Sequence, residues 1–286
     1  MVTARVIAEP ARMEASLERA RDQLARRDMP VAMAEMLEHH GDVLQIELPY
    51  GDCVSVRRVL AECFSPCDVL VAADEIVVPH LLVSDMDSTI IGQECIDELA
   101  EYAGIKPQIA TITERAMRGE LDFAMALHER VALLVGLEER AIEECLNNRI
   151  RPNSGAKAMV EALKARGCRT VLVTGGFHQF ADVIARELGF DRVVANRLAI
   201  AEGRLTGQLV GSISDAATKA CVLNAERESL GAHAVTLALG DGANDAEMLS
   251  AATYGIAYHA KPAATAVSNG SIELGDLRSV LRLLDM

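Results

Sequence analysis

The sequence has no excess of basic residues. Its 28 lysines and arginines are outnumbered by 42 aspartates and glutamates, which gives a formal net charge of −14. Bulk attraction to nucleic acid or to an anionic membrane requires a basic surface, so the composition disfavours both as partners. An acidic protein can still bind a small anion through a local positive site, such as a metal ion, a lysine or a group of backbone amides.

The sequence also lacks long apolar runs and paired cysteine spacings. No run approaches the ~18 residues of a membrane-spanning helix. The first thirty residues mix Arg with Asp and Glu and have no apolar centre, so we expect neither a secretory signal nor a transit peptide. The seven cysteines lack the short paired spacings of a zinc site. We therefore expect buried, reduced thiols in a cytoplasmic protein.

The chain has enough apolar material for two domains, since half of its 286 residues are hydrophobic. Residues 1–77 follow the order strand, helix, strand, strand, helix, strand, with a turn at His39, His40 and Gly41. This order predicts a small α+β domain of the ferredoxin-like or ACT-like type. Residues 78–286 would form a second, larger domain.

The larger domain begins with an apolar run, Leu81–Ser84, that predicts a short buried strand. Four amphipathic segments separated by glycines follow over about residues 92–150, and they predict a helical cap inserted after this first strand. From Ser154 on, helical segments alternate with apolar runs, as in parallel sheets. We therefore expect an α/β fold with a doubly wound, Rossmann-like parallel sheet.

Three of the apolar runs end in polar segments: DMDST at 85–89, TGG at 174–176 and GDGAND at 240–245. The carboxyl ends of parallel strands lie at one edge of a sheet, so these segments should meet there. A single acidic residue at such an end is most often a helix N-cap. Three polar ends, two of them acidic, favour a functional site.

The acidic residues predict a cation. Asp85, Asp87, Asp241 and Asp245 would repel one another at one edge unless a positive ion lay among them. Oxygen ligands favour Mg²⁺, which commonly shares its coordination shell with a phosphate.

The remaining polar groups suit a phosphate. Thr174 offers a hydroxyl, and Gly175 and Gly176 allow the backbone to approach an anion beside the N-terminus of the next helix. Lys219 could balance the remaining negative charge, although as a single residue it would more often be an ordinary surface lysine.

The segments DMDST, TGGF, Lys219 and GDGANDAEM resemble, in this order, the four motifs of the haloacid dehalogenase superfamily. Glu94 followed by AMRGELDF and ERVALLVGL is similar to the caps of bacterial phosphoserine phosphatases. The resemblance extends from about Leu81 to the end of the chain. His128 stands where we would expect a basic residue of the family, which leaves the rim of the pocket open to variation.

The resemblance implies a role for each acidic residue. Asp85 would be the nucleophile that forms an aspartyl-phosphate, and Asp87 would carry the proton to the leaving group and from the attacking water. Asp85, the main-chain carbonyl of Asp87 and Asp241 would hold Mg²⁺, with Asp245 and Asn244 supporting it.

The resemblance also implies the groups that bind the substrate. Thr174, Gly175, Gly176 and Lys219 would hold the phosphoryl oxygens. In the cap, Glu94 would meet an ammonium group and Arg130 a carboxylate, while Met117 and Phe123 would form an apolar lid. Without the resemblance, the two charges would be solvated helix positions and the two apolar residues ordinary core.

The expected activity is Mg²⁺-dependent hydrolysis of O-phospho-L-serine to serine and phosphate, a step of serine biosynthesis. The residues leave open a close analogue as substrate, or transfer of the phosphoryl group to an acceptor such as homoserine. The N-terminal domain could bind an amino-acid effector. The sequence does not decide whether the chain forms a homodimer.

Overall fold

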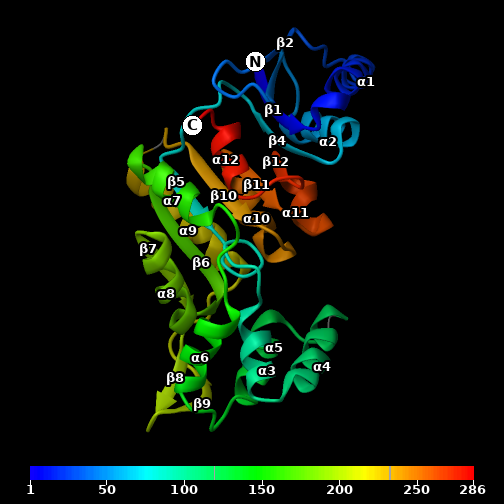
Figure 1. Ribbon diagram of the computed structural model, residues 1–286. Coiled ribbons are helices and arrows are strands. Elements are labelled where there is room, and N and C mark those ends of the chain that lie inside the picture. Colours follow the sequence, from blue (N-terminus) through cyan, green and yellow to red (C-terminus); the bar gives the residue numbers. More distant parts are fainter. Residues whose placement is uncertain (119, 232) are drawn as a thin grey trace.

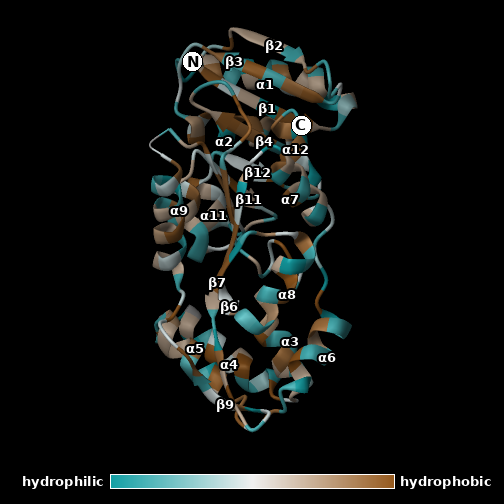
Figure 2. Ribbon diagram, turned by 90° about the vertical axis from the view of Figure 1, so that its left-hand side faces the viewer, coloured by the Kyte–Doolittle hydropathy of each residue, from teal (hydrophilic) through white to brown (hydrophobic). Residues whose placement is uncertain are grey.

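The computed structural model describes residues 1–118, 120–231 and 233–286, except for the side chain of Met117. The molecule is elongated, with the N-terminal strands and helices at one end and a group of small helices at the other (Figure 1). A view turned by 90° shows the same two ends, with the strands between them (Figure 2). Within the described residues, no helix combines the length and the apolar character needed to cross a membrane.

The N-terminal unit has the predicted order of elements. They are β1 (Val2–Ala8), α1 (Met13–Ala25), β2 (Met33–Met36), β3 (Val43–Leu48), α2 (Cys53–Phe64) and β4 (Cys67–Ala72). The strands are antiparallel in the order β2-β3-β1-β4, which is the split βαβ arrangement of ferredoxin-like folds. Leu24 of α1 and Leu60 of α2 are fully buried with strand residues in one core, so both helices cover the same face.

The second part of the sheet is parallel, as predicted. Its strands are β5 (Leu81–Ser84), β6 (Arg169–Phe177), β7 (Arg192–Asn196), β10 (Thr236–Gly240), β11 (Tyr254–Tyr258) and β12 (Gly270–Ile272). One face is covered by α7 (Ala156–Ala165), α8 (His178–Leu188) and α12 (Arg278–Leu283). The other is covered by α9 (Ala216–Leu230), α10 (Ala246–Ala251) and α11 (Pro262–Val267). The α/β, doubly wound fold class is confirmed.

One continuous sheet joins the two parts. Its order is β2-β3-β1-β4-β12-β11-β10-β5-β6-β7 within the described residues. The junction is the antiparallel pair β12 and β4, in which Ser271 lies opposite Val69. The sequence analysis did not predict β12, because a three-residue strand carries no periodicity of its own. The N-terminal unit therefore extends the main sheet through backbone hydrogen bonds.

The predicted cap is present as four helices between β5 and α7. They are α3 (Cys95–Tyr102), α4 (Lys106–Met117), α5 (Phe123–Ala132) and α6 (Arg140–Arg149). A hairpin after β7, formed by β8 (Leu198–Ala201) and β9 (Arg204–Leu209), reaches this cap (Figure 1). Gly136 N donates to Leu205 O at 2.8 Å, and Leu205 N donates to Leu137 O at 2.8 Å. The hairpin thus attaches the cap to the sheet domain.

Candidate active site

The three polar strand ends meet as expected. Strand β5 lies between β10 and β6 and is parallel to both, so all three point toward the same edge. Asp85 follows β5, Thr174 lies near the carboxyl end of β6, and Asp241 follows β10. Strand β6 continues through the TGG segment to Phe177, with an irregular register after Val173. Sheet topology alone therefore places these groups side by side.

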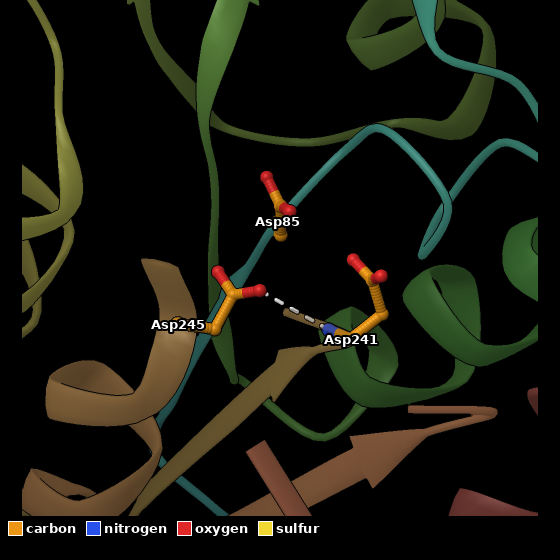
Figure 3. Close-up of side chains that lie close together, drawn as sticks. All are labelled: Asp85, Asp241 and Asp245. Carbon is orange, nitrogen blue, oxygen red and sulfur yellow. Dashed lines mark hydrogen bonds between the residues drawn. The ribbon is translucent and has the colours of Figure 1, made fainter. Parts of the chain in front are cut away.

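Three carboxylates form a compact cluster at this edge. Asp85, Asp241 and Asp245 are buried, and one carboxylate oxygen of each lies within 4.8 Å of the others. Figure 3 shows the three side chains converging from two strand ends and the following turn. Asp245 is oriented by its Oδ2, which accepts hydrogen bonds from Asp241 N at 3.1 Å and Gly242 N at 3.0 Å. Such an all-oxygen set fits a hard divalent cation.

Lys219 lies beside this cluster and is almost fully buried, with 1% of its surface exposed. Its Nζ is 2.7 Å from Asp85 Oδ1 and 2.6 Å from Asp245 Oδ1. Burial opposes the charge, but the two carboxylates outweigh burial and raise the pKa of Lys219. The residue stands in the first turns of α9, whose N-cap Asp215 accepts a hydrogen bond from Thr218 N at 2.9 Å. Helix α9 therefore places one positive charge beside the carboxylate cluster.

Asp87 stands apart from the cluster. Its Oδ1 is buried and has no hydrogen-bond partner among the described residues. Burial, reinforced by the negative charge of Glu94, raises the pKa of Asp87 to about 7. A carboxyl group with a pKa near neutrality can both donate and accept a proton at physiological pH. Burial raises the pKa of Asp85 as well, but Asp85 contacts Lys219, whereas Asp87 Oδ1 has no partner among the described residues.

The TGG segment presents donors to the same space. The Thr174 hydroxyl accepts a hydrogen bond from Gly176 N at 2.9 Å, which leaves its own proton available to another acceptor. The two glycines lie close to neighbouring side chains. A Cβ at Gly175 would lie 3.1 Å from Phe123 Cζ, and one at Gly176 would lie 3.0 Å from Asp87 Oδ2. The loop, the cap residue Phe123 and Asp87 are thus in contact.

A cavity of about 190 Å³ opens between the cap and the strand ends. The predicted residues that line it are Asp85, Asp87, Glu94, Phe123, Arg130, Thr174, Gly175, Gly176, Asp241 and Asn244. Lys219 and Asp245 are buried beside it, next to Asp85. Met117 was also predicted to contact the substrate, but its side chain lies outside the described residues. The structure thus gathers predicted residues that are up to 160 positions apart in sequence, from Asp85 to Asp245.

Glu94 and Arg130 bring opposite charges to the cap side of the cavity. Glu94 precedes α3 and accepts a hydrogen bond from Ser88 Oγ at 2.8 Å. Arg130 lies in the last turn of α5, and its Nε donates to Ala126 O at 3.2 Å. In the described part of the chain, neither side chain forms an ion pair within 4.0 Å. Both charges therefore remain available to a ligand.

Sequence reasoning missed Lys261. It precedes α11, its backbone N donates to Asp241 O at 2.8 Å, and its Nζ is 3.2 Å from Asp241 Oδ2. Ile96 and Leu127 were also missed, and they form an apolar part of the cavity wall. Lys261 lies in the segment GIAYHAKP, whose pattern does not indicate contact with Asp241.

The chain resembles known hydrolases in sequence. The family model described as haloacid dehalogenase-like hydrolase matches residues 82–250. A phosphoserine phosphatase from Idiomarina loihiensis is 46% identical over 209 residues, which cover 71% of this chain and 93% of that protein.

Solved structures extend the similarity to the whole chain. A HAD family hydrolase from Salmonella enterica serovar Typhi has a TM-score of 0.85 at 26% identity, covering 100% of this chain and 99% of that one. A phospho-aspartyl intermediate analogue of a phosphoserine phosphatase has a TM-score of 0.65 at 37% identity, covering 71% of this chain and 98% of that one. The N-terminal unit and the sheet domain therefore occur together in at least one other hydrolase.

Proposed function

The chain belongs to the haloacid dehalogenase-like hydrolases, and we propose that it hydrolyses O-phospho-L-serine to L-serine and inorganic phosphate. The observation that carries this proposal is the pair of unpaired, opposite charges at Glu94 and Arg130, which face the cavity that also contains Asp85. A phosphorylated amino acid has a phosphoryl group, a carboxylate and an ammonium group, which complement these three side chains. The similar proteins named phosphoserine phosphatase support the same substrate.

In this proposal, Asp85 attacks phosphorus and forms an aspartyl-phosphate while the bond from phosphorus to the serine oxygen breaks. Asp87 donates its proton to that leaving oxygen. After serine departs, Asp87 takes a proton from a water molecule, which attacks phosphorus, releases phosphate and regenerates Asp85. The raised pKa of Asp87 suits a group that must hold the proton first and accept it later.

The phosphoryl oxygens would be held by the Thr174 hydroxyl, the Gly175 and Gly176 backbone and Lys219. We propose Mg²⁺ as the cation, with Asp85, Asp241 and the main-chain carbonyl of Asp87 as ligands and Asp245 and Asn244 as supporting groups. The ion would neutralise charge on the transferring phosphoryl group. Arg130 would pair with both oxygens of the substrate carboxylate, and Glu94 would accept from the ammonium group. Phe123, packed against Gly175, would shield the reacting bond from bulk water.

The test is phosphate release from a substrate panel, with and without a chelator. O-phospho-L-serine should be preferred over O-phosphoethanolamine, which lacks the carboxylate, and over 3-phosphoglycerate, which lacks the ammonium group. EDTA should abolish release and added Mg²⁺ should restore it. Equal rates on all three compounds would contradict recognition of the substrate by Glu94 and Arg130. Phosphate release that resists the chelator would contradict the metal site.

We further propose that residues 1–77 form an ACT-like regulatory domain that binds an amino acid, beside a catalytic domain of residues 78–286 whose cap spans about 92–150. The supporting feature is a crevice of about 420 Å³ between α2 and α11. Arg57 and Arg58 line it together with Glu62 and Glu273, so it offers both charges that a zwitterion requires. Arg57 is buried, its Nη2 donates to Thr265 O at 3.0 Å, and its Nε has no partner among the described residues.

The crevice is connected to the cavity through α11, because Thr265 Oγ1 donates to Lys261 O and Lys261 contacts Asp241. Deletion of residues 1–77 would be a poor test, since it exposes β12 as a new sheet edge. Arg58→Ala is a more specific test, because Arg58 is exposed and its substitution should not disturb the fold. We expect this variant to weaken inhibition of phosphate release by L-serine, and Arg21→Ala, an exposed arginine of α1, to leave it unchanged. Identical serine inhibition in both variants would contradict an effector site in this crevice.

A further inference from the structure

Asn196 ends β7 and is almost fully buried, with 2% of its surface exposed. Its side-chain amide uses every group it has for the backbone of two other segments. Nδ2 donates to Gly175 O at 2.8 Å and to Ser214 O at 3.2 Å, while Oδ1 accepts from Ser214 N at 2.8 Å. The residue does not line the cavity. All three of its bonds therefore go to the protein backbone.

The bond to Gly175 concerns the TGG segment directly. A carbonyl oxygen that faces a phosphoryl group repels it, whereas backbone N–H groups attract it. The Asn196 amide donates to the Gly175 carbonyl. The N–H of the same peptide group, on Gly176, donates to the Thr174 hydroxyl at 2.9 Å. Together these two bonds fix both sides of the Gly175–Gly176 peptide. The Thr174 hydroxyl proton then remains available to an anion.

The bonds to Ser214 concern the second group of anion contacts. Ser214 precedes Asp215, the N-cap of α9, and Lys219 follows in the first turns of this helix. The segment before α9 is therefore held by two hydrogen bonds with the same amide that holds Gly175, one donated to Ser214 O and one accepted from Ser214 N. No other residue of the described chain has a side chain bonded to the backbone of both segments.

We propose that Asn196 is a positioning residue that keeps the Thr174 hydroxyl, the Gly175 backbone N–H and Lys219 at the spacing of one phosphoryl group. The inference rests on the proposed phosphoryl site and names a residue that determines its geometry. Asn196 acts through Gly175 and Ser214 and does not contact the substrate. It specifies affinity for the phosphoryl group and contributes nothing to the recognition of the amino-acid part.

Asn196→Asp is the decisive substitution, because it keeps the shape and removes both N–H donors. At pH 8 the introduced carboxylate would face two carbonyl oxygens and repel them. We expect the dissociation constant of inorganic phosphate, measured by calorimetry with the magnesium-loaded protein, to rise about tenfold or more, as loss of buried hydrogen bonds implies. Near pH 6 the buried carboxyl group should take up a proton and regain one donor, so the ratio to the unsubstituted protein should shrink. Asn196→Ala should show no such recovery.

Asn269 supplies a matched control. Its Nδ2 donates to Val71 O and to Thr253 O, both at 2.8 Å, and its Oδ1 accepts from Gly255 N at 2.7 Å, the same pattern as in Asn196. It precedes β12 and does not line the cavity. Asn269→Asp should lower thermal stability but leave the dissociation constant of phosphate within about twofold.

Equal phosphate affinity in Asn196→Asp and Asn269→Asp would overturn the proposal, as would a loss in Asn196→Asp that is the same at pH 6 and pH 8. If the unsubstituted protein does not bind phosphate, the proposed phosphoryl site is wrong and this role falls with it. These two failures are distinguishable, because the first is seen only by comparing variants and the second needs no variant.

Discussion

Lys219 shows how strongly the fold determines whether a lysine is solvated or buried in an ion pair. As a residue in a sequence it would usually be a solvated surface lysine, yet it is buried between two carboxylates. A buried charge is tolerated only with partners of opposite sign, and here Asp85 and Asp245 are both within 2.7 Å. The sequence contained Lys219 and both acids, but their contact results from three elements that are far apart along the chain.

Asp85→Asn should abolish phosphate release and preserve the fold. The substitution removes the attacking oxygen and hardly changes the side-chain volume. Lys219 keeps its contact with Asp245 at 2.6 Å, so the buried lysine is not left unpaired. We expect an activity loss of at least about a thousandfold in a phosphate-release assay, with an unchanged circular dichroism spectrum. Turnover within tenfold of the unsubstituted protein would contradict a covalent mechanism at this residue.

Arg130→Ala should discriminate between substrates. It removes the guanidinium that would pair with the substrate carboxylate, so kcat/KM for O-phospho-L-serine should fall about a hundredfold. Hydrolysis of an aryl phosphate, which has no carboxylate there, should change little. Arg140→Ala, an exposed arginine of the same cap, is the control and should alter neither. Equal losses on both substrates would mean that Arg130 supports the cap and does not read the carboxylate.

At the scale of elements, predictability followed the strength of local patterns. Strands β5, β6 and β10 were expected because their apolar runs are continuous, and the cap helices because glycines separate amphipathic segments. Strand β12 and helix α11 were missed, because three and six residues are too short for a periodic signal. Strand β12 exists because Gly270–Ile272 pair with β11 on one side and β4 on the other. Such pairing is a property of the assembled sheet.

The residues of the candidate site also differ in how far the sequence predicts them. The strand ends predicted where Asp85, Thr174 and Asp241 would meet, because parallel topology fixes that edge. Asn196 and Lys261 could not be found from sequence, since Asn196 reads as an ordinary strand end and Lys261 as a solvated charge. Their roles depend on hydrogen bonds across 21 and 20 residues, to Gly175 and Asp241 respectively.

Asp276 links the starts of two helices and should make stability depend on pH. Its carboxylate accepts from Ser154 Oγ before α7 and from Arg278 N in α12, both at 2.8 Å. Hydrogen bonding and charge pairing with Arg278 lower the pKa of Asp276 to about 2, from an ordinary value of 3.8. A lowered pKa in the folded state contributes stability that is fully present above about pH 4 and is lost as the pH falls through 2.

Asp276→Asn should therefore lower the free energy of unfolding by about 1–2 kcal/mol at pH 7. Urea unfolding at pH 7 and pH 2.5 is the measurement, and the difference from the unsubstituted protein should shrink at the lower pH. Asp22→Asn, an exposed position of α1, serves as the control. A difference that is equally large at both pH values would show that shape, and not charge, accounts for the effect.

At the scale of the whole molecule, the junction between the N-terminal unit and the rest is held by Asp68. This fully buried residue of β4 accepts hydrogen bonds from the backbone N–H groups of Glu273, Leu274 and Gly275, and from Ser279 Oγ at 2.6 Å. The carboxylate thus organises the segment that connects β12 to α12. Backbone pairing makes the two parts structurally continuous, and Asp68 adds side-chain bonds to it, as do Arg5, which donates to Leu283 O, and Arg57, which donates to Thr265 O.

Asp68→Asn should weaken that junction. The NH₂ group of asparagine would replace one carboxylate oxygen, and it cannot accept hydrogen bonds from the N–H groups that it faces. We expect the free energy of unfolding to fall by about 2–4 kcal/mol, with hydrogen exchange accelerated first at residues 273–275. Ser279→Ala removes only one of the bonds and should have a smaller effect at the same amides. If both variants exchange alike, Asp68 does not organise this segment.

The pairing of β4 with β12 also sets an order of events during protein synthesis. Strand β4 ends at Ala72, and β12 begins at Gly270, about 200 residues later. At translation rates of roughly 5–20 residues per second, β4 waits about 10–40 s on the ribosome for its partner. During that interval the N-terminal unit carries an open strand edge that could pair with another nascent chain. Strand β12 therefore closes this edge once it is synthesised, and chains truncated before Gly270 should bind chaperones more strongly than chains that contain β12.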